Sequence, residues 1–539
     1  MLDLILYNAR IYTQCPDQPW AQALGIQNGR IIILGNDQDV RALRASRTQL
    51  INAHGRLVLP SFTDAHIHLF GLTQQQGHLA LYHARSMAQA LGQLRVHASR
   101  LPEGAWALGY GWNETLWPEH RFPTRFELDA VTGPRPALLW RTDLHVAVAN
   151  SAALKAANIT AQTPDPPAGI IDRDEHGEPT GVLRELAICT VLKHSPRMPE
   201  QKAAKNLKKI ASQLHQVGIT SVHDQRLKGF TAGGTEAFQL YQQMAAQDDL
   251  PLRISVNFET SQLQSIIDLG MKSGCGDEWV RFGHVKLFAD GSLGAHTACM
   301  LSPYEDTPND AGLCVTSPEE MAHAIQQAHR NAIAVSVHAI GDRANRIVLD
   351  IFEETLRAET PNPPALPHRI EHVQIIQPQD QPRLAALGLT ASMQPLHCTD
   401  DIPNAERYLG ERGRNAYPFR SLLDVGTVLA FGSDAPVADP NPWLGIHAAV
   451  TRQRVGGEPE GGWYPEQRIS VAEAVQAYTL GPAQAIGQAH QQGRLAQGYL
   501  ADLIMLDRNI FEISPAAIAD TRVLLTMLGG KVIYEMSSW

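Results

Sequence analysis

Two histidines lie at the end of a buried apolar run near the start of the chain. The run spans Leu59–Phe70 and reads LPSFTDAHIHLF, so that Ile67 separates His66 from His68. Alternate side chains of an extended strand point the same way, and both imidazoles therefore project from one face. Two imidazoles held side by side are typical of half of a divalent-metal site, although two hydrogen-bonded histidines near a turn give the same pattern.

Single polar residues at the ends of later apolar runs extend this half-site. They are Lys286 in VRFGHVKLFAD, His338 in IAVSVH, His372 in HRIEHV and Asp434 in TVLAFGSD. Each has an ordinary alternative role, such as capping a turn for Asp434, core packing for His338, or a stem laid along apolar surface for Lys286. One shared metal site accounts for all of these positions at once, and we therefore favour it over a set of unrelated roles.

Eight short apolar or β-branched runs must position these residues. The runs are Leu59–Phe70, Gly218–Asp224, Leu252–Phe258, Val280–Asp290, Ile333–His338, His368–Val373, Leu389–Gln394 and Thr427–Asp434. Helical segments such as Pro318–Asn331 and Asp342–Glu359 separate most of the later runs. This alternation predicts an α/β fold of the (β/α)₈ TIM-barrel type, with the active site at the carboxyl ends of the strands. The alternative is an open doubly wound sheet, which usually carries a glycine-rich phosphate loop that is missing here.

Both ends of the chain read as short strands. Asn28-Gly29 is a hairpin signal between two such runs, and Gly529-Gly530 is a turn between two others. We predict that residues 1–58 and 490–539 form one composite β-sandwich domain, and that residues 59–489 form the barrel domain. Unrelated edge strands at the two ends are the alternative.

Residues 70–200 lack the strand–helix rhythm of the rest of the chain. The segment is rich in tryptophan, proline and loop signals, and it carries Asp143 and His145 near a change from strand to helix. Because it follows the strand of the paired histidines, we predict an insertion that covers the catalytic end of the barrel. Trp112, Asp143 and His145 are its candidate substrate contacts, with packing inside the insertion as the alternative role.

The composition excludes several classes of protein. The chain has 539 residues, 44% of them hydrophobic, and a net charge of −10, which disfavours nucleic acid as a partner. The most basic stretch, Lys202–Lys209, has helical spacing and suits a solvated helix face. No apolar run is long enough to predict a membrane span, and the first residues lack a signal-peptide pattern. Six scattered cysteines without a C-x-x-C pair suit reduced thiols, and we expect a cytoplasmic location.

The segments around these residues resemble those of the amidohydrolase superfamily. LPSFTDAHIHL, RTDLH…NSAAL, TGVLRE, VKLFADGSLG, VHAIGD, RIEHVQ, GSDAPV and GYLADLIMLD are together similar to amidohydrolase family 3, which includes N-substituted formamide deformylases. The similarity covers nearly the whole chain. His296 in GSLGAHTA departs from the pattern, which has a small residue and then arginine, and the resemblance gives no role to Glu185.

This resemblance implies a metal-dependent hydrolase that cleaves a non-peptide C–N bond of a small molecule. The implied ligands are His66, His68 and Asp434 for the more buried ion, His338 and His372 for the other, and Lys286 as a bridge between the two. An ammonium group has no lone pair, so Lys286 would first be carboxylated by CO₂ to a carbamate. The ions are expected to be zinc, and Asp434 would serve as general base and then general acid. Binding of a single ion without carboxylation is the main variant.

Two other functions are compatible with the same residues. One is hydrolysis of an ester, lactone or phosphoester, because the metal chemistry does not distinguish a C–N bond from a C–O bond. The other is a catalytically silent barrel used for regulation or binding. Metal analysis and substrate profiling separate the three functions, and a homo-oligomer is compatible with each of them.

Overall fold

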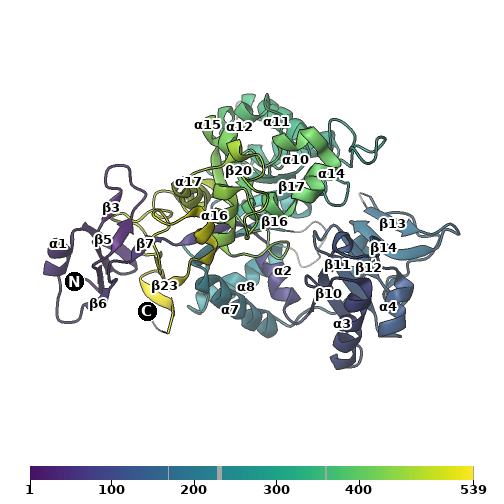
Figure 1. Cartoon of the computed structure of the whole chain (residues 1–539), viewed down its shortest axis with the longest axis horizontal. Coiled ribbons are helices and arrows are strands. Elements are labelled where there is room, and N and C mark those ends of the chain that lie inside the picture. Colours follow the sequence, from purple (N-terminus) through teal and green to yellow (C-terminus); the bar gives the residue numbers. More distant parts are fainter. Residues whose placement is uncertain (168, 227–233, 359–360, 538–539) are drawn as a thin grey trace.

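An eight-stranded parallel barrel lies at the centre of the molecule (Figure 1). The computed structural model describes residues 1–167, 169–226, 234–358 and 361–537. In sheet order the strands are β21 (Val428–Phe431), β20 (Thr390–Met393), β19 (Arg369–His372), β18 (Val335–Ala339), β17 (Val280–Phe288), β16 (Arg253–Glu259), β15 (Ile219–Asp224) and β8 (Phe62–Ile67). The predicted (β/α)₈ class is confirmed.

The first and last strands of the barrel meet through side chains and a close backbone approach. The Asp64 carboxylate accepts hydrogen bonds from the N–H of Ser433 at 3.0 Å and from its hydroxyl at 2.5 Å. The backbone N–H of Asp434 donates to the carbonyl of His66 at 2.6 Å. A Cβ atom at Gly432 would lie 2.3 Å from the His66 nitrogen, so only glycine allows β8 and β21 to come together here.

The first predicted run, Leu59–Phe70, is longer at both ends than its barrel strand in the structure. β7 (Leu57–Pro60) belongs to a neighbouring sheet, β8 starts at Phe62, and helix α2 (Leu69–Gln75) starts directly after His68. Both strands are fully buried, and burial on both faces removes the alternation that marks where one strand ends. The other seven predicted runs each overlap one barrel strand.

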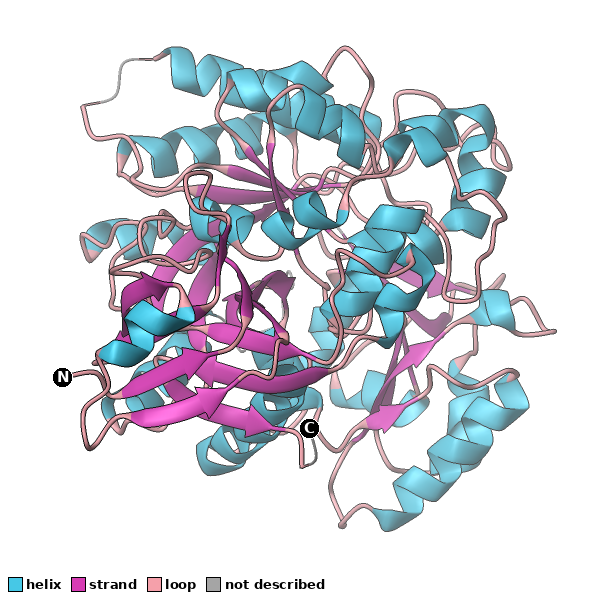
Figure 2. Ribbon diagram, turned by 60° about the vertical axis from the view of Figure 1, so that its left-hand side comes forward, coloured by secondary structure: helices cyan, strands magenta, loops and turns pink. Residues whose placement is uncertain are grey.

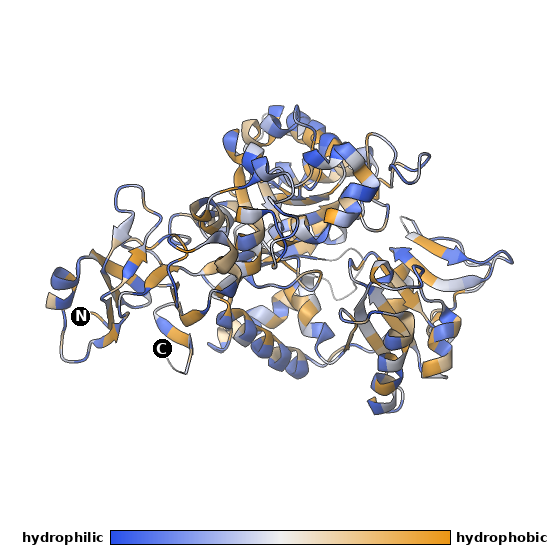
Figure 3. Cartoon of the chain, in the orientation of Figure 1, coloured by the Kyte–Doolittle hydropathy of each residue, from blue (hydrophilic) through white to orange (hydrophobic). Residues whose placement is uncertain are grey.

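Helices cover the outside of the barrel. They include α7 (Glu200–Gln216), α8 (Gly234–Ala246), α9 (Leu263–Asp268), α10 (Pro318–Arg330), α11 (Asp342–Arg357), α12 (Gln381–Ala386), α13 (Pro395–Asp400), α14 (Ile402–Leu409), α15 (Phe419–Asp424), α16 (Pro442–Thr451), α17 (Val471–Ala477) and α18 (Leu480–Ala485). Figure 3 shows that they carry both hydrophilic and hydrophobic residues. The lysines of Lys202–Lys209 are exposed on α7, as predicted. No helix among the described residues has the length and apolar character that crossing a membrane requires.

Residues 70–200 contain an α/β unit with its own six-stranded sheet. In sheet order its strands are β13 (Gly169–Arg173), β14 (Pro179–Glu185), β12 (Val146–Ala149), β11 (Ala137–Arg141), β10 (Ala107–Trp112) and β9 (Leu79–Ala80). Strands β9, β10 and β11 are parallel, and α3 (Met87–Arg100) and α4 (Arg125–Thr132) connect them. The expectation of no strand–helix alternation was therefore wrong, because short strands interrupted by glycine and by long loops hide the period. The unit also contains α5 (Ser151–Ala156) and α6 (Ala187–Leu192).

Strands from both ends of the chain lie in a separate pair of sheets (Figure 2). One has the order β24 (Lys531–Glu535), β23 (Val523–Leu528), β22 (Leu503–Leu506), β7, β2 (Arg10–Tyr12) and β3 (Trp20–Ala21). The other has the order β5 (Arg30–Gly35), β4 (Ala23–Gln27), β1 (Leu4–Tyr7) and β6 (Gln49–Asn52). Strand β22 pairs antiparallel with β7, and we refer to these two sheets together as the end domain.

Two of the six cysteines are joined in a disulfide. Cys299 and Cys314 lie in the loop after β17, with their Cα atoms 5.3 Å apart. The expectation of six reduced thiols was therefore wrong for this pair, whose spacing in the sequence matches no motif. Because disulfides are rare in cytosolic proteins, the cysteines no longer support a cytoplasmic location.

Candidate metal centre

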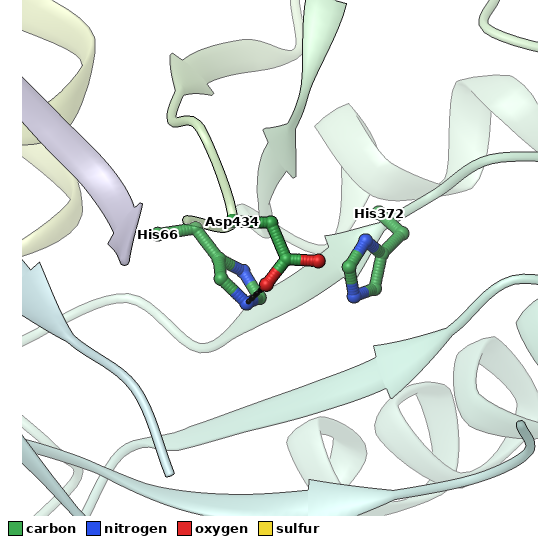
Figure 4. Close-up of side chains that lie close together, drawn as sticks. All are labelled: His66, His372 and Asp434. Atoms are coloured by element: carbon green, nitrogen blue, oxygen red, sulfur yellow. Dashed lines mark ion pairs between the residues drawn. The ribbon is translucent and has the colours of Figure 1, made fainter. Parts of the chain in front are cut away.

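One cavity at the carboxyl ends of the barrel strands is lined by all six predicted ligands. It contains about 640 Å³ of empty space, part of which is open to solvent. The ligands lie at or just beyond the ends of their strands: His66 and His68 at β8, Lys286 on β17, His338 on β18, His372 on β19 and Asp434 after β21. Figure 4 shows His66, His372 and Asp434 directed toward one another.

The paired histidines both present Nε2 to one carboxylate. Asp434 Oδ1 lies 3.3 Å from His66 Nε2 and 2.9 Å from His68 Nε2. The opposite ring nitrogens are held elsewhere, since His66 Nδ1 lies 2.6 Å from Glu371 Oε2 and His68 Nδ1 lies 3.3 Å from the carbonyl of Gln225. A second partner on the distal nitrogen fixes the orientation of the ring, as it does for histidine ligands of metals.

His338 and His372 are held in the same manner from the opposite side of the cavity. His372 Nδ1 donates to the side-chain oxygen of Gln394 at 2.8 Å, and His338 Nε2 donates to the carbonyl of Gly291 at 2.9 Å. The nitrogens left over are therefore Nε2 of His372 and Nδ1 of His338. The two ring centroids are 4.5 Å apart.

Burial keeps most of these histidines neutral. It lowers the pKa of His68, and it lowers the pKa of His338 and His372 well below the usual value. His66 differs: burial and Lys286 oppose its positive charge, but Asp434 and Glu371 outweigh them and raise its pKa. Neutral imidazole is the form that binds a metal, and a cation among these groups would take the place of the proton on His66.

Lys286 is buried in the wall of the same cavity. Burial lowers its pKa to about 8, against the opposing effect of the Glu371 and Asp434 carboxylates. A lysine with this pKa is substantially neutral just above pH 8, and a neutral amine is the form that reacts with CO₂.

These groups fit a divalent cation. One ligand atom from each of His66, His372 and Asp434 lies within 4.8 Å of the other two, and all three side chains are buried. Imidazole nitrogens together with a carboxylate oxygen form a donor set that suits zinc and similar ions. The structure groups His372 with His66 and Asp434, so the division of the ligands between two ions stays a prediction.

The structure separates the three candidate substrate contacts. Asp143 and His145 line the cavity. Trp112 does not: it is fully buried in the core of the insertion, where its Nε1–H donates to the carbonyl of Leu139 at 2.9 Å. This position favours the packing role for Trp112.

Several residues of the site were not identified from the sequence. Glu371 is fully buried, binds His66 and forms an ion pair with Arg369 at 2.6 Å. Glu185 and Asp290 line the cavity, and burial raises the pKa of Asp290 to about 7. The alternation of Arg369 and Glu371 within a buried strand was the available signal, because residues two apart face the same side.

His296, the departure from the family pattern, lies outside the lining of the cavity. Its Nε2 is 3.1 Å from the Asp306 carboxylate, and its ring packs on that of Tyr408 with centroids 4.2 Å apart. These contacts indicate a structural role for His296.

Both the sequence and the fold of this chain are similar to those of known proteins. Residues 49–534 match the amidohydrolase family. The protein LONG AFTER FAR-RED 3 of Arabidopsis thaliana is 33% identical over 99% of this chain and 91% of its own length. The putative amidohydrolase YtcJ of Bacillus subtilis is 32% identical and the N-substituted formamide deformylase of Arthrobacter pascens is 28% identical, each over 99% of both chains. The solved structure of a metal-dependent hydrolase from Pyrococcus horikoshii aligns with a TM-score of 0.77 and 27% identity, covering 95% of this chain and 99% of its own.

Proposed function

Because this chain belongs to the amidohydrolase family, we propose that it hydrolyses a non-peptide C–N bond, of the amide or formamide type, in a small molecule. The observation that carries the proposal is the single cavity lined by His66, His68, Lys286, His338, His372 and Asp434. The similarity to a formamide deformylase over nearly the whole chain supports the choice of a C–N bond.

The proposed cofactor is a pair of zinc ions held by these six residues. Lys286 would join the set as a carbamate, and its lowered pKa supports this because carboxylation consumes the neutral amine. When bound, the ions supply Lewis acidity, which lowers the pKa of water from ~15.7 toward ~7 and polarises a carbonyl oxygen.

Asp434 is the proposed general base and acid. Burial alone would raise its pKa, but the charge of His66 and hydrogen bonds from His66 and His68 outweigh burial and hold the pKa well below its usual range. The carboxylate is therefore ionised and accepts a proton from the attacking water. It then returns that proton to the nitrogen that leaves, so that the amine departs uncharged.

The outer part of the cavity would bind the rest of the substrate. Leu144, Leu186, Ile188 and Val437 give it an apolar wall, which suits an uncharged organic substituent. The protonated ring of His145 is the proposed donor to the substrate carbonyl, through Nε2, because Nδ1 is the nitrogen engaged with Glu185 in the described part of the chain.

The test is a panel of matched substrates. Zinc-loaded protein is assayed against N-formyl amines, N-acyl amines and cyclic amides, each paired with the ester or lactone of the same acyl group. We expect release of amine from at least one C–N substrate, with kcat/KM above that of its C–O counterpart. Turnover confined to esters and lactones would overturn the proposed bond class. Asp434→Asn is the control and should lose turnover on every substrate.

A further inference from the structure

Glu185 lines the cavity of the candidate metal centre. In the described part of the chain, its side chain contacts His145 and Thr297 and none of the candidate ligands. Both of its carboxylate oxygens are 3.0 Å from His145 Nδ1, and its backbone N–H donates to the His145 carbonyl at 2.9 Å. Strand β14, which ends at Glu185, pairs with β12, which starts at Val146. The register of the insertion sheet therefore places the carboxylate opposite the imidazole.

The same carboxylate is also fixed from the barrel side. Thr297 Oγ1 donates to Glu185 Oε1 at 3.1 Å. A Cβ atom at Gly291 would lie 2.6 Å from Glu185 Oε1, so glycine leaves the space that the carboxylate fills. The carbonyl of Gly291 accepts from His338, and the loop that holds Glu185 is thus the loop that also orients a candidate ligand.

His145 is held from its other end as well. Its backbone N–H donates to Asp143 at 3.1 Å, and Asp143 forms an ion pair with Arg141 at 2.6 Å. Ser292 of the barrel loop donates to the same carboxylate at 3.2 Å. With its backbone and Nδ1 both fixed, the ring has one nitrogen left for a ligand in the cavity, which is Nε2. The ring centroid is 5.9 Å from that of His338.

We propose that Glu185 is a positioning residue that holds the His145 ring with Nε2 directed at the carbonyl group of the substrate. Glu185 and His145 then form a dyad carried by the insertion, whereas the metal ligands are carried by the barrel. With Nδ1–H donating to Glu185, Nε2 carries a proton only when the ring is protonated. Burial opposes that charge, but Glu185 together with Asp143 and Asp434 outweighs burial and raises the pKa of His145 to about 9. The inference rests on the proposed function only in that it needs a substrate with a carbonyl group.

The experiment is a double-mutant cycle on zinc-loaded protein. Glu185→Gln, Glu185→Ala, His145→Ala and the double alanine variant are assayed with the best substrate of the panel, whether an amide or an ester. We expect each single change to lower kcat and kcat/KM by about 10–100-fold with metal content unchanged. In the His145→Ala background, Glu185→Ala should cost less than about 2-fold, because the residue acts through a ring that is no longer there. Additive losses would overturn the proposal.

Asp172→Asn is the matched control. Asp172 forms an ion pair with Arg184, the neighbour of Glu185, at 2.8 Å and does not line the cavity. The change removes a carboxylate from the same sheet, and kcat should stay within about 2-fold of the parent protein.

A crystal structure of Glu185→Ala tests the positioning role without a measurement of activity. The proposal expects the His145 ring to rotate or to lose order while the metal ligands stay in place. A ring that keeps its orientation in this variant would overturn it. The double-mutant cycle can be measured with an ester as well as with an amide. A protein that hydrolyses only esters would therefore refute the proposed C–N bond class without deciding this inference.

Discussion

At the scale of single residues, each candidate histidine ligand is defined by the partner on its other ring nitrogen. A carboxylate holds His66, backbone carbonyls hold His68 and His338, and the Gln394 amide holds His372. In the neutral form of each ring, these partners select the tautomer whose lone pair is directed at the cavity. The site is therefore arranged before any ion enters.

His338→Ala should lower the bound metal and abolish turnover, because it removes one of the converging nitrogens from the cavity. Turnover should fall by more than the ~10–100-fold that changes in outer partners cost. Metal content by mass spectrometry and kcat on the best substrate check this. His323→Ala, an exposed histidine on α10, is the control and should change neither quantity. Full metal content and full activity in His338→Ala would contradict the assignment.

The pKa of Lys286 predicts how its carboxylation depends on pH. With a pKa of about 8, the neutral fraction of this amine rises ~25-fold between pH 6.5 and pH 8.5. At constant CO₂ pressure, the carbamate signal from ¹³CO₂ in NMR spectra of zinc-treated protein should therefore appear faster at the higher pH. Lys286→Arg should give no signal. Unmodified Lys286 in a metal-loaded crystal would argue against a carbamate.

The sequence predicts site residues best where their place near the end of a strand indicates that they face the active site. The six residues were proposed as ligands because each lies at or near the end of an apolar run, and all six line one cavity. Glu371 was missed and Glu185 was given no role, because what each residue does depends on a partner far away in the sequence, His66 or His145, which only the folded sheets bring near. Trp112 was misleading, because an aromatic residue in an insertion is equally suited to packing.

At the scale of elements, the seam between β8 and β21 governs the geometry of the metal centre. His66 ends one strand and Asp434 follows the other, and the hydrogen bond between their backbones sets the distance between two candidate ligands. His372 and Asp434 have φ angles of 72° and 60°. Left-handed backbone is costly for these residue types and is common at functional sites.

Gly432→Ala should destabilise the protein and weaken metal binding together, since its Cβ would lie 2.3 Å from the backbone nitrogen of His66. We expect a loss of about 1–3 kcal/mol in the free energy of unfolding, as for overpacked sites. Tm and metal affinity are the measurements. Gly92→Ala in the exposed face of α3 meets no atom within 4 Å and is the control, with Tm equal to or above that of the parent. A normal Tm in Gly432→Ala would show that the seam can open without cost.

Strand positions follow from the sequence where a run has turns on both sides. The run from Leu59 to Phe70 starts without one, because only Ser61 separates β7 from β8 and both strands are buried. The disulfide could not be predicted from the sequence for a different reason. Cys299 and Cys314 approach each other only because the loop after β17 folds back along Asp290.

At the scale of the whole molecule, a buried ion pair joins the barrel to the end domain. Arg253 of β16 donates to Asp502 at 2.7 Å and 3.2 Å, and Asp502 also accepts from the N–H of Gly529. The Arg253 side chain is 4% exposed and that of Asp502 is 12% exposed, so water stabilises neither charge well.

Asp502→Ala should lower the free energy of unfolding by about 3–5 kcal/mol, because it removes the ion-pair partner of the buried Arg253. Calorimetric Tm measures the loss. Arg197→Ala is the control: its ion pair with Glu236 is exposed, and such pairs contribute about 0–1 kcal/mol. Equal shifts in the two variants would mean that the pair does not hold the two parts together.

The pairing of β7 with β22 fixes when the fold can be completed during synthesis. β7 leaves the ribosome before the barrel and β22 leaves after it, so one edge of β7 stays unpaired until β22 has been synthesised. At about 5–20 residues per second, that interval lasts tens of seconds. Throughout it, the N–H and C=O groups on the edge of β7 that later pairs with β22 are open to other nascent chains. A circular permutant that makes β22 and β23 immediately before β1 should shorten the wait and raise the soluble yield without altering the finished enzyme.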